Sequence, residues 1–233
     1  MAINVNDVYK SVLVVLEQQK RGVLTPNEFN RIATQSQLEI YNQYFDDLNQ
    51  LLGMPQTSLA YADRMALLDE KISLFKTSEK LENEDPDKGS EYIVPKEVQE
   101  LGSVICNGKE VQRIQQHEVY TTNVSPLTAP SPDYPVYTYE SKKIVMYPRI
   151  GNADIIVNYL KAPAKPVWAF KINKDLGSYV YNPFGSVDFE IHNSDQPLLI
   201  DKILGYVGVL TKDQFVMSLA NSKEQQINVN DQK

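Results

Sequence analysis

The segment His192-Asn193-Ser194-Asp195 gathers the three side-chain types of a serine hydrolase triad. In such a triad the histidine takes a proton from the serine, and the aspartate orients the histidine. Folding, and not adjacency, brings those groups together, and consecutive residues of a chain point in different directions. We therefore interpret this segment as the end of a strand followed by a helix cap. The second histidine, His117, has no histidine or cysteine near it in the sequence.

Two groups of carboxylates suggest acid–base or metal chemistry. Asp46 and Asp47 are neighbours in a predicted helix, where consecutive side chains diverge by about 100°. They cannot cooperate as general acid and base without another element. Asp85, Asp87 and Glu91 resemble part of a calcium loop, but a proline and a misplaced glycine break the required pattern. A solvated linker is the interpretation we prefer, and we expect neither metal nor cofactor.

Composition indicates an ordinary globular protein, with 42% hydrophobic and 23% charged residues. The single cysteine, Cys106, excludes an internal disulfide framework and a cysteine-based zinc site, and it fits a reducing cytosol. Because it adjoins a predicted hairpin turn, we interpret it as a small strand residue. No apolar run approaches the roughly 18 residues that a bilayer span requires, so we expect no membrane partner.

The formal charge is −7 at pH 7. A conventional duplex-binding protein gains much of its affinity from lysine and arginine side chains that neutralise phosphates. Tight, wrapped DNA binding is therefore not expected. An acidic wall would repel phosphate and oppose sticking, which leaves transient passage of DNA past the protein compatible with the composition.

The longest predicted helix ends at Leu52 and has a sharply defined start. Thr25 can cap it, and Pro26 suits its first position. Glu28 stands three residues after Thr25, where its carboxylate can reach the backbone N–H of the cap. The glycine and the proline that follow Leu52 favour an end at that point.

This helix carries more apolar surface than one neighbour can cover, because its apolar side chains form two adjacent stripes at about 100° per residue. The first stripe contains Phe29, Ile32, Ala33, Ile40, Tyr44 and Leu51. The second stripe, our candidate subunit interface, contains Leu38, Tyr41, Phe45, Leu48 and Leu52. A helix lying on its own core needs an arc of only roughly 100°. Either the helix lies deep in an all-helical core, or one stripe faces the core and the other faces a neighbouring subunit.

Helical periodicity at both chain ends predicts a bundle that the two ends share. Further helices are expected near residues 4–19, over 58–75, and after a cap at Ser194 or Asp195. Since short isolated helices are marginal in water, we expect the C-terminal helix to pack on the N-terminal helices. The fold class is therefore α+β, with a mainly antiparallel β domain inserted into a helical bundle.

The inserted region shows alternating periodicity. Strands at 104–106 and 111–114 flank Asn107-Gly108, a dipeptide suited to a tight hairpin turn. Three further strands are expected at 137–139, 143–147 and 154–159. The predicted organisation is a bundle over 1–78, an acidic linker over 79–91, a β-rich domain over 92–193, a C-terminal helical segment over 194–223 and a flexible tail over 224–233.

Within the tail, Ile227 and Val229 alternate with polar residues at strand spacing. A segment with this pattern can add an edge strand to a partner or fill a groove on it. The alternative is a disordered tail that makes no contact.

Several segments resemble a virion ring protein of the crAss-like bacteriophages, a component of the head-to-tail connector. They are MAINVNDVYKSVL, RGVLTPNEFN, QLEIYNQYFDDLNQLL, IVMYP, NYLKAPAKPVW and FEIHNSDQPLLIDKILGYVGV, which together cover most of the chain. More distantly, the layout resembles the adaptor, or tail tubular, proteins of short-tailed phages, which form a ring beneath the portal.

The resemblance implies a non-enzymatic structural protein of the virion. It implies a homo-oligomeric ring of twelvefold symmetry, contact with the portal and with other connector or tail proteins, and passage of viral DNA through the ring. Assembly would take place in the host cytoplasm. The tail residues Ile227 and Val229 would then dock on the portal, or on an adjacent ring subunit.

A carbohydrate- or receptor-binding virion module is the alternative. Its aromatic platform would comprise Tyr134, Tyr137, Tyr139, Tyr147, Tyr159 and Trp168. Tyrosines in alternating strands are, however, more often half-buried sheet residues than a binding platform.

Overall fold

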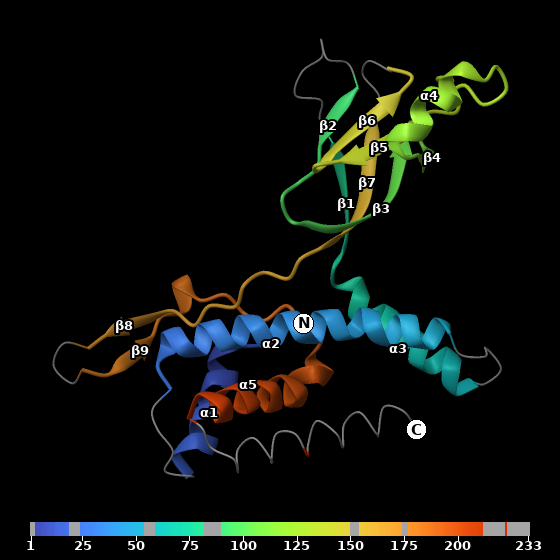
Figure 1. Cartoon of the computed structure of the whole chain (residues 1–233). Coiled ribbons are helices and arrows are strands. Elements are labelled where there is room, and N and C mark those ends of the chain that lie inside the picture. The colour runs from blue at the N-terminus through green and yellow to red at the C-terminus, as the bar shows by residue number, and fades with distance from the viewer. Residues whose placement is uncertain are drawn as a thin grey trace. The chain divides into compact units, whose positions relative to one another are not determined.

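The computed structural model describes residues 3–18, 24–53, 59–81, 90–149, 154–173, 177–211 and 222. Its fold is α+β, as predicted (Figure 1). The chain divides into two compact units, one formed by Met1–Leu74 with Pro163–Lys233 and the other by Phe75–Ala162. We call them the helical unit and the β unit. The β unit is thus inserted in sequence between the two parts of the helical unit.

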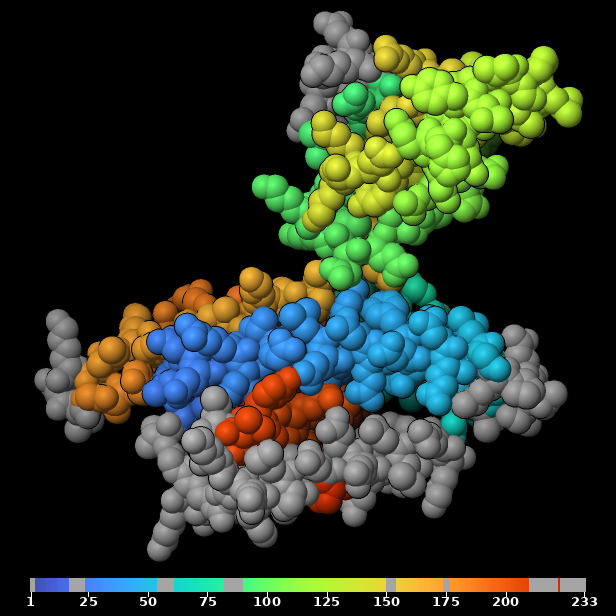
Figure 2. Space-filling view, in the orientation of Figure 1, coloured from blue at the N-terminus to red at the C-terminus, as the bar shows by residue number. Residues whose placement is uncertain are grey.

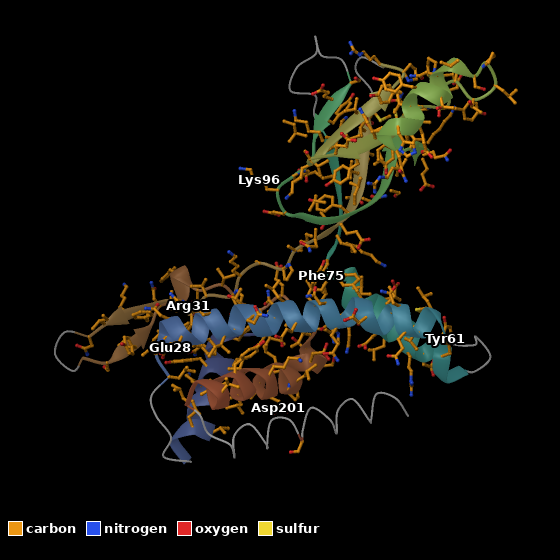
Figure 3. The ribbon with its side chains drawn as sticks, viewed as in Figure 1. Glu28, Arg31, Tyr61, Phe75, Lys96 and Asp201 are labelled. Carbon is orange, nitrogen blue, oxygen red and sulfur yellow. The ribbon has the colours of Figure 1, made fainter. Side chains whose placement is uncertain are left out.

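The described part of the helical unit contains α1 (Val5–Gln18), α2 (Pro26–Leu52), α3 (Leu59–Ser73) and α5 (Gln196–Thr211). The predicted start of α2 is confirmed. The Glu28 backbone N–H donates to the Thr25 hydroxyl at 3.4 Å, and the Thr25 backbone N–H donates to the Glu28 carboxylate at 3.0 Å. Glu28 lies at this end of the helix in Figure 3. The helix ends at Leu52, also as predicted.

Helix α2 is the central element of the helical unit. It packs against α3 and α5, and α5 also packs against α1 (Figure 1). The first predicted stripe of α2 is buried throughout, with Phe29, Ile32, Ala33, Ile40, Tyr44 and Leu51 all in the interior. On α5, the buried apolar residues are Leu198, Leu199, Ile203, Leu204 and Val207.

Residues 163–193 belong to the helical unit, which differs from the predicted β-domain range of 92–193. Ile3 and Phe189 exchange backbone hydrogen bonds of 3.1 and 3.0 Å, and the Val5 N–H donates to the Asp188 carboxylate at 2.9 Å. These contacts fasten the segment to the start of α1. Because they are long-range backbone contacts, the local alternation of side chains did not reveal to which unit the segment belongs.

The same segment contains a two-stranded antiparallel sheet, formed by β8 (Phe170–Ile172) and β9 (Tyr179–Tyr181). Two short 3-10 helices follow it, η1 (Pro183–Gly185) and η2 (Asn193–Asp195). Helix α5 begins directly after η2.

The β unit is built on a seven-stranded sheet with the order β1-β7-β3-β4-β5-β6-β2. Its strands are β1 (Lys76–Leu81), β2 (Glu91–Ile93), β3 (Val98–Cys106), β4 (Lys109–Arg113), β5 (Val136–Glu140), β6 (Lys143–Tyr147) and β7 (Ile155–Lys161). The described pairings are antiparallel except for that of β4 with β5, which is parallel. Helix α4 (Gln116–Val124) lies between those two strands in sequence.

The hairpin at Asn107-Gly108 is confirmed. Both residues have positive φ angles, 50° and 79°, and Cys106 pairs with Lys109 across the turn. These angles are those of the turn types that match the twist of a two-residue hairpin. Cys106 is buried among the apolar side chains of the sheet, as expected for a strand residue.

Strand β1 was not predicted, since residues 76–78 fell within the predicted bundle and 79–81 within the predicted linker. Its sequence, KTSEKL, is polar, and only Leu81 is buried. Backbone pairing with β7 holds it at the edge of the sheet, so its side chains carry little strand signal. Residues 82–89 of the predicted linker lie outside the described residues.

Candidate functional site

The second stripe of α2 is only partly covered. Leu38 is 39% exposed and Leu52 is 56% exposed, whereas Phe45 and Leu48 are half-buried. Leu38, Phe45 and Leu52 are seven residues apart, the spacing at which side chains stay on one side of a helix that packs against a partner. We call these three residues the α2 stripe.

Tyr41 does not belong to this exposed surface, although it was predicted as an interface residue. It is only 3% exposed, and its ring meets the ring of Phe45 edge-on at a centroid distance of 4.9 Å. Tyr41 lies one helical turn from both Gln37 and Tyr44, which are also buried. The buried side of α2 is therefore wider than the first stripe alone, and it includes Tyr41.

A second apolar surface is formed by β8 and β9, which we call the arm. Side chains become more exposed from its base to its tip: Phe170 and Tyr181 are half-buried, whereas Ile172 and Val180 are 61% and 50% exposed. Register places Ile172 and Val180 on opposite faces, because Ile172 pairs with Tyr179 and Val180 pairs with Lys171. Both faces of the arm tip are therefore open.

Trp168 holds the base of the arm on the helices. Its backbone N–H donates to the Asn30 side chain at 2.8 Å, and its carbonyl accepts from the Asn30 amide at 3.3 Å. The indole N–H donates to Asn6 at 3.2 Å, and the ring lies 4.4 Å from that of Tyr9. The arm is thus anchored near the N-terminal end of α2 (Figure 2).

The two strands of the arm were not predicted from the sequence. The triplets FKI and YVY alternate aromatic or β-branched residues at strand spacing around a short segment that contains a glycine. That pattern is typical of a short hairpin. Each strand has only three residues, however, so the alternation is too short to be a strong strand signal.

The β unit has an apolar surface of its own on α4 and the loop that follows. Its exposed large side chains are Tyr120, Val124, Leu127 and Tyr134. Lys109 links part of this loop to the sheet, because its ammonium lies 3.5 Å from the Asp133 carboxylate and 5.4 Å from the centre of the Tyr134 ring. Exposed apolar patches on soluble proteins commonly mark interaction sites.

A buried polar cluster joins three elements of the helical unit. The Tyr44 hydroxyl donates to one oxygen of Asp195, and the Lys71 ammonium lies 2.8 Å from the other oxygen. Burial, and then the hydrogen bond to Asp195, raise the pKa of the Tyr44 phenol far above its ordinary value. The Lys71 ammonium also lies over the Tyr44 ring, 5.4 Å from its centre. These contacts tie α2, α3 and η2 together.

Residues 193–195 form η2, and its cap is the side chain of His192, whereas the predicted cap was Ser194 or Asp195 after a strand end. The side chains of this segment are also closer than expected. His192 Nδ1 lies 2.8 Å from the Ser194 hydroxyl and accepts from the Ser194 N–H at 3.3 Å, because η2 turns the chain back on itself. The Ser194 hydroxyl donates to Asp195 at 3.3 Å. Asp195 thus contacts the serine, whereas in a triad the aspartate orients the histidine.

The other candidates for chemistry are dispersed. Cys106 is buried, and burial, followed by the charge of Asp154, raises the pKa of its thiol. A raised pKa reduces the thiolate that a nucleophile requires. His117 is exposed on α4. Glu91, the third carboxylate of the pattern that resembles a calcium loop, lies 3.8 Å from the Lys143 ammonium. Asp85 and Asp87 lie outside the described residues, as do the tail residues Ile227 and Val229.

Comparison with protein-family models and with curated proteins finds no match. Within the described ranges, no helix combines the length and the apolar character that a bilayer crossing requires.

Proposed function

We propose that this chain is a structural subunit of the ring in a phage head-to-tail connector, as its sequence resemblance implies. The observation that carries the proposal is the contrast between the two sides of α2. One side is buried in the subunit, whereas Leu38 and Leu52 on the other remain in solvent. Exposing leucines at heptad spacing is costly for a soluble monomer and is expected of a helix that packs against a partner.

In the proposed assembly, each subunit contacts two neighbours through two different faces, as a closed ring of identical chains requires. The resemblance suggests twelvefold symmetry, a portal on one side and other connector or tail proteins on the other. Viral DNA would pass through the ring during packaging and ejection. The net charge of −7 favours passage of DNA through the ring rather than adhesion of DNA to it, because an acidic wall repels phosphate. The protein would be found in the virion and, during assembly, in the host cytoplasm.

The C-terminal tail is proposed to hold the portal. Ile227 and Val229 carry the alternating pattern that strand addition uses. Removal of residues 224–233 should leave the stability of the subunit unchanged but weaken its incorporation into the connector. Full incorporation of the truncated chain would show that the tail is dispensable.

Ring formation is tested by measuring the mass of the purified protein over a range of concentrations, alone and with the portal. We expect closed oligomers, and we expect Leu38→Asp with Leu52→Asp to abolish them while the helical circular dichroism signal remains. The matched control is Val14→Asp with Leu67→Asp, which also places charges at exposed helical positions. A wild-type chain that stays monomeric alone and with the portal would contradict the proposal.

The carbohydrate-binding alternative loses half of its six predicted platform residues. Tyr137, Tyr159 and Trp168 are buried, so their faces are not available for stacking on a sugar ring. Tyr137 and Trp168 also belong to different units. No observation favours this alternative over the ring.

A further inference from the structure

We propose that the arm of one subunit packs on the α2 stripe of the next subunit, and that this contact closes the ring. The inference rests on the proposed ring function and deepens it by naming the two faces that meet. The partner of each surface is therefore a second copy of this chain.

The two surfaces occupy different ends of one rigid element. The arm is fixed to α2 at Asn30 through Trp168, and Figure 1 shows β8 and β9 beside one end of this helix. The α2 stripe extends from Leu38 to Leu52. At 1.5 Å per residue, the stripe begins about 12 Å and ends about 33 Å beyond Asn30 along the helix axis. Two separate faces on one body are what a head-to-tail contact needs, whereas a two-fold dimer uses one face twice.

The arm needs a surface of the kind that the α2 stripe provides. A two-stranded hairpin is marginally stable in water unless a helix or further strands cover it. At the arm tip, Ile172 and Val180 project from opposite faces and both are exposed. A neighbouring helix with apolar side chains in a row would cover one face and bury the exposed leucines of the stripe in the same contact.

The charges around the two surfaces are complementary. Residues 38–52 contain Glu39, Asp46 and Asp47 but no lysine or arginine. Residues 163–181 contain Lys165, Lys171 and Lys174 and a single acidic residue, Asp175, so this segment is net basic. Opposite charges steer two faces together and fix their register.

Asp46 and Lys171 are the charges best placed to pair across this contact. Glu39 is already engaged within the subunit, because the Tyr206 hydroxyl donates to it and the Lys202 ammonium lies 3.8 Å away. Asp46 and Lys171 are both exposed.

The test blocks one face at a time. The arm variant carries Ile172→Asp with Val180→Asp, and the stripe variant carries Leu38→Asp with Leu52→Asp. All four positions are exposed in the subunit, so both variants should fold, which circular dichroism checks. Each variant alone should be monomeric, because a ring needs both faces. An equal mixture should form a heterodimer and no larger species, since one intact arm and one intact stripe remain.

Masses are measured by light scattering, with tags of different size on the two variants. The Val14→Asp, Leu67→Asp control should assemble like the wild type. Reversing one charge with Lys171→Glu should weaken association at least tenfold, and adding Asp46→Lys should restore most of it.

Three results would overturn the inference. If the wild type assembles but the mixed variants stay monomeric, the ring stands and the pairing of arm with stripe is wrong. Self-association of either single-face variant would show a two-fold contact instead. If the wild type itself does not assemble, alone or with the portal, the ring proposal fails and this inference fails with it.

Discussion

The hydroxyl of Tyr44 donates a hydrogen bond to the carboxylate of Asp195, and this bond joins the middle of α2 to the turn that starts α5. Lys71 of α3 binds the other oxygen of the same carboxylate at 2.8 Å. One buried carboxylate therefore positions three helices. This arrangement holds α2, α3 and the start of α5 together.

Replacing Tyr44 and replacing Asp195 should both destabilise the subunit, but by different amounts. Tyr44→Phe deletes one hydrogen bond and should lower the free energy of unfolding by roughly 1–3 kcal/mol. Asp195→Ala also leaves the half-buried Lys71 ammonium without its counter-charge and should therefore cost more than Tyr44→Phe. Urea denaturation measures both, with the exposed Tyr120→Phe as the neutral control. Equal losses for Tyr44→Phe and Asp195→Ala would argue against the shared carboxylate.

The Tyr44 phenol predicts how stability changes at alkaline pH. Its pKa is raised in the folded state above the ordinary value of 10.0, by burial first and then by Asp195. Above that value the unfolded chain loses the proton while the folded chain keeps it, so stability falls as pH rises. The stability difference between the wild type and Tyr44→Phe should therefore narrow above pH 10. A gap that stays constant in denaturant titrations between pH 8 and pH 11 would contradict this assignment.

The capping box of α2 predicts an acid-sensitive helix start. The Thr25 hydroxyl, and then the Thr25 backbone N–H, donate to Glu28 and lower the pKa of its carboxyl below the ordinary value of 4.5. The contribution of Glu28 is present above that value and is lost as pH falls through the lowered pKa. Glu28→Gln should therefore be less stable than the wild type at pH 7 and equally stable in acid.

Thr25→Ala is the companion variant for the cap and should cost about 1 kcal/mol at neutral pH. Thermal melts followed by circular dichroism report both variants. A Glu28→Gln protein that matches the wild type at pH 7 would show that the carboxylate adds nothing to the cap.

Substitutions at Tyr41 and Leu52 should distinguish the buried side of α2 from its candidate interface. Tyr41→Glu should unfold the subunit or lower its melting temperature strongly, because it places a charge in the interior. Leu52→Glu should leave the melting temperature nearly unchanged and reduce assembly, because Leu52 is exposed. Melting curves and oligomer mass, measured on the same samples, test this contrast. A folded Tyr41→Glu monomer that fails to assemble would indicate that Tyr41 belongs to the interface after all.

Prediction from sequence succeeded where the signals are local. The capping box of Thr25 and Glu28, the turn at Asn107-Gly108 and the buried stripe of α2 follow from residue type and spacing alone, and the structure contains all three. Covalent neighbours decide these features, so a single sequence is sufficient to find them.

Prediction was less successful where distant segments meet. Tyr44, Lys71 and Asp195 are far apart in the sequence, and nothing in their spacing indicates that they share a hydrogen-bonded cluster. The edge strand β1 depends on pairing with β7, and the arm depends on Trp168 reaching Asn30. Tyr41 was misplaced because the width of a buried helix face is set by its neighbours in space.

The central claim is tested most directly by a cryo-electron microscopy reconstruction of the collar of the phage particle. We expect to find this chain in a closed ring around the DNA channel, next to the portal, with the arm of each subunit on the α2 stripe of its neighbour. A collar whose density is filled by other proteins, with this chain in the capsid, in a fibre or missing from the particle, would contradict it.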